Sequence, residues 1–502
     1  MIALAALALG LAAAPTAIVH HPVSTKIAAA QQRFDEGLTL VYSFNRSEAR
    51  ERFEDAAKLD PKLAMAWWGV ALAVGPNINE AMSAADRDAA AGALAKATAL
   101  AGGASAEERR YIDALAHRYP SPAQAAADTA HGYPAYRDAM KALTSDFPND
   151  LDAATLYAES IMDVDTVRFV HGAPAAAQTA VVRILDSVLE RDPHHLGANH
   201  YLIHAWDHAG DAHHALASAT YLADLNYEPA QSHLQHMPAH TFLDVGDLAN
   251  VTRVGRLSSL DDDGYAKAKG IDPFSLRYHR HNLDFWAGGA FLTGERGEID
   301  QSLAEYTAGH DSGAALILAR ESRFTEADAV PRPVHGTYAL LEWHYARTLS
   351  AVGRDDLIAA QREVTAIDVI TVAQGTKHPT DDSLDAIAHA RLAHALGRDA
   401  EAIDLLRACI AKTADDPPEA FAPWSFPAGE WLGDILLERG DLAGAEEAFR
   451  ADLARTPNNP RVQYRLMRTL TYEGRLDDAR VLAPQVAAHW LGDSTDLHEP
   501  DL

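Results

Sequence analysis

Cysteine and basic residues are both scarce in this chain of 502 residues. The single cysteine, Cys409, excludes an internal disulfide, a zinc site made of thiolates and an iron–sulfur cluster. Acidic residues outnumber basic ones by 71 to 43, which gives a formal net charge of −28. A charge of this sign and size repels phosphate groups, so we expect no nucleic-acid binding.

Long apolar runs are also rare. One run, IALAALALGLAAA from Ile2 to Ala14, is too short to span a membrane, but it is typical of the apolar part of a signal peptide. No basic segment precedes it, so a buried first helix or a misplaced start codon stays an alternative. We predict a signal peptide over residues 1–17, export, and no membrane span. The familiar catalytic motifs, such as a Walker A loop, GxSxG or HExxH, are absent.

Small residues recur with a fixed period near the C-terminus. Gly440 and Gly474 are 34 residues apart, and so are Ala445 and Ala479. The order Gly433, Leu436, Gly440, Ala445, Phe449, Pro457 resembles the order Gly37, Leu40, Ala49, Phe53, Ala56, Pro61 near the N-terminus. Small residues let two antiparallel helices approach, an aromatic ring fills the gap, and proline ends the second helix. A 34-residue period with this pattern is typical of the tetratricopeptide repeat (TPR).

The pattern predicts an all-α fold, a right-handed TPR-like solenoid of stacked helical hairpins. We expect a single array over residues 25–492. Its repeats are expected near 33–66, 67–101, 149–191, 194–228, 229–268, 273–300, 335–372, 380–414, 426–459 and 460–492.

Histidine is concentrated in one window. Of 25 histidines, ten lie between His194 and His240. His200 and His204 are four residues apart, as are His236 and His240, and the two pairs are offset by 36 residues. Residues at i and i+4 share a helix face, and first helices of adjacent repeats pack ~8–10 Å apart. The spacing therefore predicts that these four histidines bind one divalent transition metal on the concave surface.

The same repeat register places two carboxylates beside these histidines. Glu159 and Asp284 occupy positions that match His204 and His240, and His281 lies close to Asp284 in sequence. We therefore consider His281 and Asp284 as further ligands, and Glu159 as a candidate general base. Imidazole and carboxylate ligands without thiolate suit Zn, Cu(II), Fe or Ni, and nearby methionines keep copper among the candidates.

The alternative is that the histidines pack in a polar seam between helices or bridge through water. Pro238 also predicts a kink, or a helix start, close to His236. Five other histidines of the window are expected to be solvated, namely His194, His195, His213, His214 and His233.

Two other short motifs come from the second repeat. Asn77 and Asn79 could hydrogen-bond a ligand in the groove, or they could form an Asx turn between helices. Trp67 and Trp68 are expected to pack between repeats.

Several strings resemble a bacterial family of exported TPR proteins, namely FDEGLTLVYSFNRSEARERFEDAAKLDPKLAMAWWGVALAVGPNIN, LYAESIMD, ANHYLIHA, HMPAHTF, YHRHNLDF and FRADLARTPNN. Members of that family typically read FNHxEAxxxF, HxYIHAxE, HMPxHIY and HNxHF in this order. The resemblance covers nearly the whole chain and implies a TPR fold, export to the bacterial periplasm or beyond, and a recurrent histidine groove, but no reaction. Arg46 and Asp284 replace two of the usual histidines, and Asp207 stands near the acidic position of HxYIHAxE.

Two function classes follow from these observations. The first is a metal-binding solenoid, which would be a metal-dependent enzyme if one coordination position stayed open for water or substrate. The second is a periplasmic TPR scaffold that binds a peptide or protein partner without metal. In either class, a small molecule or peptide could occupy the concave groove.

Overall fold

A computed structural model describes residues 18–119, 132–164, 175–207, 211–374, 379–413, 427–493 and 497. The predicted signal peptide at 1–17 lies outside these residues. Within them, every regular element is a helix, and the all-α prediction is confirmed. A search of the same residues finds no helix that is long and apolar enough to cross a membrane.

The chain forms two compact units. Unit 1 comprises Met1–Phe169, Pro174–Ala205 and Ala217–Gln235, and unit 2 comprises Val170–Ala173, Trp206–Leu216 and His236–Leu502. The predicted repeat boundaries and the single array over 25–492 stay predictions.

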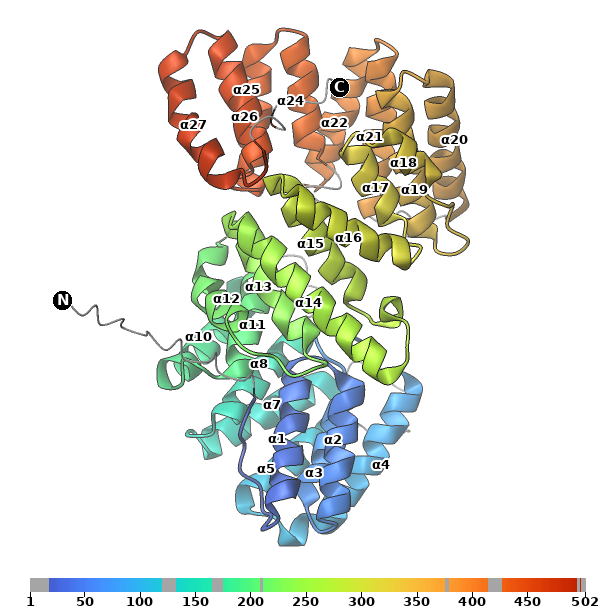
Figure 1. The fold of residues 1–502 in the computed structure, drawn as a ribbon. Coiled ribbons are helices and arrows are strands. Elements are labelled where there is room, and N and C mark those ends of the chain that lie inside the picture. The colour runs from blue at the N-terminus through green and yellow to red at the C-terminus, as the bar shows by residue number, and fades with distance from the viewer. Residues whose placement is uncertain are drawn as a thin grey trace, which may run out of the picture. The chain divides into compact units, whose positions relative to one another are not determined.

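Unit 1 is built from consecutive antiparallel helices, in blue to green in Figure 1. They are α1 (Ala28–Tyr42), α2 (Arg46–Leu59), α3 (Ala64–Ala73), α4 (Ala84–Leu100), α5 (Ala106–Arg118), α7 (Gly132–Asp146), α8 (Leu151–Val164), α10 (Ala175–Arg191), α11 (Leu196–Trp206) and α12 (Leu216–Ala223).

The close approach of α1, α2 and α3 depends on two glycines. The ring of Phe53 on α2 is fully buried between Gly37 on α1 and Gly69 on α3. A Cβ atom at Gly37 would lie 2.8 Å from the ring, and one at Gly69 would lie closer still. Only a residue without a side chain leaves room for the aromatic ring at these helix separations. This confirms the small-residue and aromatic packing that the sequence predicts.

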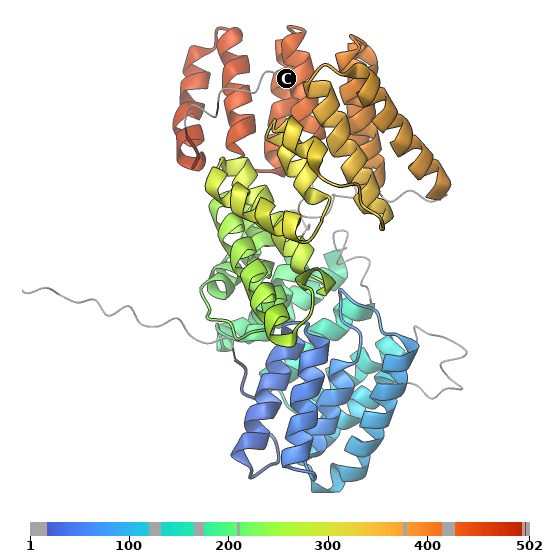
Figure 2. The ribbon, with the colours of Figure 1, turned by 45° about the vertical axis from the view of Figure 1, so that its right-hand side comes forward.

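Unit 2 continues the succession of hairpins, as Figure 2 shows for its C-terminal helices. Its helices are α13 (Ser232–Val245, whose first turn belongs to unit 1), α14 (Leu248–Lys269), α15 (His279–Thr293), α16 (Arg296–Ala308), α17 (Gly313–Arg320), α18 (Phe324–Ala329), α19 (Thr337–Gly353), α20 (Leu357–Gln374), α21 (Pro379–Ala395), α22 (Asp399–Thr413), α24 (Ala428–Glu438), α25 (Leu442–Arg455), α26 (Pro460–Tyr472) and α27 (Leu476–His489).

The 34-residue spacing of the C-terminal glycines has a backbone cause. Gly440 follows α24 with φ of 75°, and Gly474 follows α26 with φ of 79°. A left-handed residue at this position ends a helix and turns the chain into its antiparallel partner. Within the first of these hairpins, the ring of Phe449 lies against Gly433, which repeats the packing of Phe53 in unit 1.

Two histidine clusters as candidate metal centres

The first cluster, called here triad 1, consists of His200, His204 and His233. His200 and His204 lie one turn apart on α11, and His233 comes from the first turn of α13. One ring nitrogen of each histidine lies within 4.8 Å of those of the other two. Their exposed fractions are 0%, 7% and 3%, so the three imidazoles are held in a space that is almost closed to solvent.

A hydrogen bond at Nδ1 fixes the orientation of the His200 ring. Its Nδ1 lies 2.7 Å from the backbone carbonyl oxygen of Tyr42. Because a carbonyl oxygen only accepts hydrogen bonds, Nδ1 carries the proton and Nε2 carries the lone pair. That Nε2 lies 3.2 Å from Nε2 of His233.

The second cluster, triad 2, consists of His236, His240 and His281. The first two lie one turn apart on α13, and His281 lies on α15. One ring nitrogen of each again lies within 4.8 Å of the others. Nε2 of His281 lies 3.3 Å from Nε2 of His240. On its other side, Nδ1 of His240 lies 3.2 Å from a carboxylate oxygen of Asp207.

The two triads are built on one plan. Each takes an i, i+4 pair from one helix and a third histidine from another helix, and in each a ring Nδ1 faces an oxygen atom. In triad 1 this is the hydrogen-bonded carbonyl of Tyr42, and in triad 2 it is a carboxylate oxygen of Asp207 at ion-pair distance. Metal-binding histidines usually have such an acceptor behind them, because it fixes the tautomer and the ring orientation. The triads differ in exposure, since all of triad 1 is buried whereas His240 and His281 are partly exposed.

A phenylalanine ring contacts every imidazole of each triad. The ring centre of Phe44 lies 4.7, 5.6 and 4.8 Å from those of His200, His204 and His233. In triad 2, the ring centre of Phe285 lies 6.0, 4.8 and 4.7 Å from those of His236, His240 and His281. Apolar surroundings disfavour protonated imidazole, and neutral imidazole is the form that binds metals.

The nitrogen separations fit a tetrahedral metal ion. Bonds of ~2.0–2.1 Å to zinc place two ligand nitrogens ~3.3–3.4 Å apart. The observed separations of 3.2 and 3.3 Å between Nε2 atoms are close to this value. A hydrogen bond between two imidazoles has a similar length, ~3 Å, so the polar seam fits the same distances.

The predicted pairs thus belong to two triads in different units. The structure brings His200 and His204 together with His233, and it brings His236 and His240 together with His281. The single site of four histidines stays a prediction.

Two other expectations about this window were wrong. His233 and His195, expected to be solvated, are only 3% and 8% exposed. His233 is buried because α13 already begins at Ser232, which places it within the helix. The helix start expected close to His236 was also wrong, because α13 begins at Ser232 and continues through Pro238. The kink stays a prediction. The histidines that are exposed as expected are His194, His213 and His214.

The two predicted carboxylates, Glu159 and Asp284, each pair with an arginine. Glu159 is buried 3.4 Å from Nη2 of Arg118, which also contacts Asp163. In unit 2, Asp284 accepts hydrogen bonds from Tyr306 at 2.6 Å and from Arg280 at 3.0 Å. Burial raises the pKa of Asp284 to about 7, although the charge of Arg280 opposes this shift. Neither Glu159 nor Asp284 belongs to the group of ligand atoms that forms triad 1 or triad 2.

Other residues singled out by the sequence also have defined places. Asn77 and Glu159 line one small cavity of about 20 Å³ together with Phe44. The side chain of Asn77 accepts a hydrogen bond from the backbone of Asn79, which is the Asx turn. Trp68 packs against Phe34 and Tyr111, as expected for a residue between helices.

No protein-family model and no curated protein matches the chain. Among solved structures, it is similar to the Cut9–Hcn1 hetero-tetramer of the APC/C at 11% identity and a TM-score of 0.37, over 78% of this chain and 74% of that one. It is similar to the TPR domain of P58(IPK) at 13% identity and a TM-score of 0.23, over 91% of this chain and 98% of that one. Human IFIT1, in a dimer with m7Gppp-AAAA, is similar at 11% identity and a TM-score of 0.36, over 92% and 90% of the two chains.

Proposed function

We propose that this protein is an exported helical-repeat protein that binds divalent transition metal ions, one at each histidine triad. The observation that carries the proposal is the repetition of one arrangement, three imidazoles within 4.8 Å of one another, in two units of the same chain. Zinc, copper and iron all accept imidazole ligands, and zinc agrees best with the tetrahedral separations of the Nε2 atoms.

The exposure of the triads suggests different roles for the two ions. Three imidazoles leave the fourth position of a tetrahedral ion to water. In triad 2, the partly exposed His240 and His281 give that position access to solvent, as a catalytic or exchangeable ion requires. Triad 1 has no comparable access among its described residues, which favours a structural ion.

Export is part of the same proposal. The apolar run near the N-terminus and the resemblance to exported bacterial TPR proteins favour the periplasm or the medium. Expression with the native N-terminus and N-terminal sequencing of the periplasmic fraction tests this part. A chain that keeps its first residues in the cytoplasm would contradict it.

Metal content of untagged protein is the decisive measurement. We expect two zinc ions per chain after reconstitution with zinc, one in H204A, one in H240A and none in the double variant. The exposed His213 offers a matched control, and H213A should retain both ions.

The single variants also separate the two arrangements of the site. If all four predicted histidines bind one ion, H204A or H240A alone removes all bound metal. If the wild type binds no metal under replete conditions, the metal proposal is wrong and a scaffold that binds a peptide or protein partner takes its place.

A further inference from the structure

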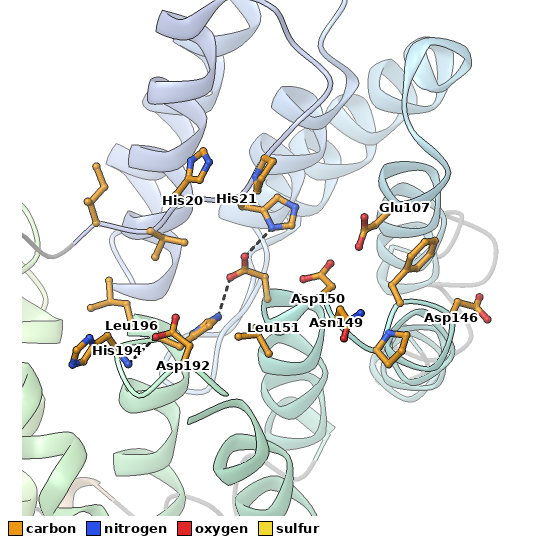
Figure 3. Close-up of a pocket in the computed structure, with 17 residues that line it drawn as sticks. His20, His21, Glu107, Asp146, Asn149, Asp150, Leu151, Asp192, His194 and Leu196 are labelled. Atoms are coloured by element: carbon orange, nitrogen blue, oxygen red, sulfur yellow. Dashed lines mark hydrogen bonds and ion pairs between the residues drawn. The ribbon is translucent and has the colours of Figure 1, made fainter. Parts of the chain in front are cut away.

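A separate cavity of about 660 Å³ lies in unit 1 and is lined by no histidine of either triad. Its walls come from the segment before α1, from α5 and from the starts of α8 and α11 (Figure 3). None of its described lining residues is lysine or arginine, so the field inside it attracts cations. The ionisable groups are Glu107, Asp146, Asp150, Asp152, Asp192, His20, His21, His194 and His195.

One imidazole in this cavity is held from behind by a buried carboxylate. Nδ1 of His21 lies 2.8 Å from Asp152, whose side chain also accepts a hydrogen bond from Tyr42 at 2.7 Å. Nε2 of His195 lies 3.3 Å from the same carboxylate. With Nδ1 donating to Asp152, the neutral ring of His21 has its lone pair on Nε2, which is the arrangement of a metal-binding histidine.

Two further carboxyl groups lie beside this imidazole. Glu107 and Asp150 are within hydrogen-bond reach of each other, and Asp150 accepts a hydrogen bond from Tyr111 at 2.6 Å. Two carboxyl groups at this separation need a shared proton or a cation between them. Figure 3 shows the ring of His21 close to both side chains, and ligand atoms of His21, Asp150 and Asp152 lie within 4.8 Å of one another.

We propose that this cavity is a third metal site, which binds a divalent cation through Nε2 of His21 and the carboxylates of Asp150 and Glu107. Asp152 is a positioning residue that fixes the ring of His21. One imidazole and two carboxylates form an oxygen-rich ligand set that suits Mn²⁺, whereas the triads offer only nitrogen. The site therefore differs in metal preference from the triads and does not depend on them.

Titration with Mn²⁺, followed by electron paramagnetic resonance of the free ion, tests the proposal on the full chain. We expect one Mn²⁺ per chain, with affinity at least 10-fold lower in D150N and in E107Q. Asp150 also caps α8 by accepting from the backbone N–H of Ala153, a role that asparagine keeps, so D150N is expected to fold. The helical circular dichroism spectrum checks this.

The control variant distinguishes a ligand site from general attraction by negative charge. Asp146 lines the same cavity but is half-exposed and paired with Arg110, so D146N removes one charge without removing a ligand. We expect D146N and H240A to bind Mn²⁺ within about 2-fold of the wild type. The proposal is overturned if the wild type binds no Mn²⁺ below millimolar concentration, or if D146N weakens binding as much as D150N. Loss of binding in H240A would also overturn it, because the ion would then belong to triad 2.

Discussion

The ring of His200 donates from Nδ1 to the backbone carbonyl of Tyr42, 2.7 Å away. Its Nε2 therefore carries a lone pair before any ligand arrives. In triad 2, a carboxylate oxygen of Asp207 lies 3.2 Å from Nδ1 of His240, so a negative charge lies behind that ring. Triad 1 thus has a backbone acceptor that substitution cannot remove, whereas the carboxylate behind His240 in triad 2 can be tested by mutation.

Replacing Asp207 should weaken metal binding at triad 2 alone. D207N removes the negative charge behind His240, and loss of such a partner typically costs 10–100-fold in metal affinity. The affinity is best measured by competition with a chelator in the H204A background, where one triad is left. The exposed Asp211 supplies the control, D211N. Equal affinities for D207N and D211N would show that Asp207 does not orient a ligand.

Acidification should release the metal from both triads. Each triad needs three neutral imidazoles, and free imidazole takes up a proton below about pH 6.5. The apparent affinity is therefore expected to fall with every pH unit below this value, with more than one proton taken up per ion released. Metal content after dialysis at a series of pH values measures this. An affinity that does not change between pH 7 and pH 5 would contradict imidazole ligation.

The glycine at position 69 should be essential for packing. G69A places a Cβ atom against the ring of Phe53, which is fully buried. Overpacking of this kind typically costs 1–3 kcal/mol. Gly92 lies inside α4 with nothing within 4 Å of its Cβ position, so G92A should stabilise the protein by about 0.5–1 kcal/mol. Chemical denaturation of both variants measures the difference, and equal effects would refute the packing argument.

Features that depend on local spacing could be predicted from the sequence. Gly37 and Phe53 are such a case, because the repeat period places them opposite each other. The pairs of histidines at i and i+4 are another. Their spacing places both members on one helix face, whatever the rest of the chain does.

Features that depend on where a helix begins could not be predicted in the same way. The burial of His233 follows from the start of α13 at Ser232. Phe44 contacts triad 1 from the turn between α1 and α2, where its φ of 57° is unusual for a bulky residue. Phe285 did carry a signal, because it lies four residues after His281 and so shares its helix face. The cavity around His21 depends on an irregular segment that has no periodic pattern.

Stability in unit 2 should depend on pH through His389. Hydrogen bonds to Asp385, and then to Asp368, raise the pKa of His389 to about 9, against the effect of burial. A histidine in the unfolded chain has a pKa near 6.5, so the folded protein binds the extra proton between these values. The stabilisation is therefore complete below about pH 6.5 and is lost as the pH rises through about 9.

Melting temperatures of H389Q and wild type at pH 6 and pH 10 measure this effect. We expect H389Q to melt lower than the wild type at pH 6 and at nearly the same temperature at pH 10. The exposed His335 provides the control, H335Q, which should match the wild type at both values. A difference between H389Q and wild type that stayed constant with pH would mean that the charge on His389 is not responsible.

Glu159 belongs to a buried cluster around Arg118, and its structural role in this cluster can be tested. One guanidinium faces two carboxyl groups, Glu159 and Asp163, and all three side chains are nearly inaccessible to solvent. Burial, and then the charge of Glu159, raise the pKa of Asp163 well above its usual value, so the folded state keeps a proton that the unfolded chain loses. Stability should therefore fall as the pH rises above about 4, the pKa of aspartate in an unfolded chain.

Two substitutions in this cluster should differ strongly in how much they destabilise the protein. R118M leaves two buried carboxyl groups without a cation and should destabilise unit 1 by about 3–5 kcal/mol. E159Q removes the repulsion between Glu159 and Asp163 while keeping the partner of Arg118, so it should cost little and should flatten the fall in stability at rising pH. Denaturation curves of both variants between pH 4 and pH 8 measure this. If E159Q were as destabilising as R118M, both carboxylates would be needed to balance the arginine, and Glu159 would have no freedom to act as a base.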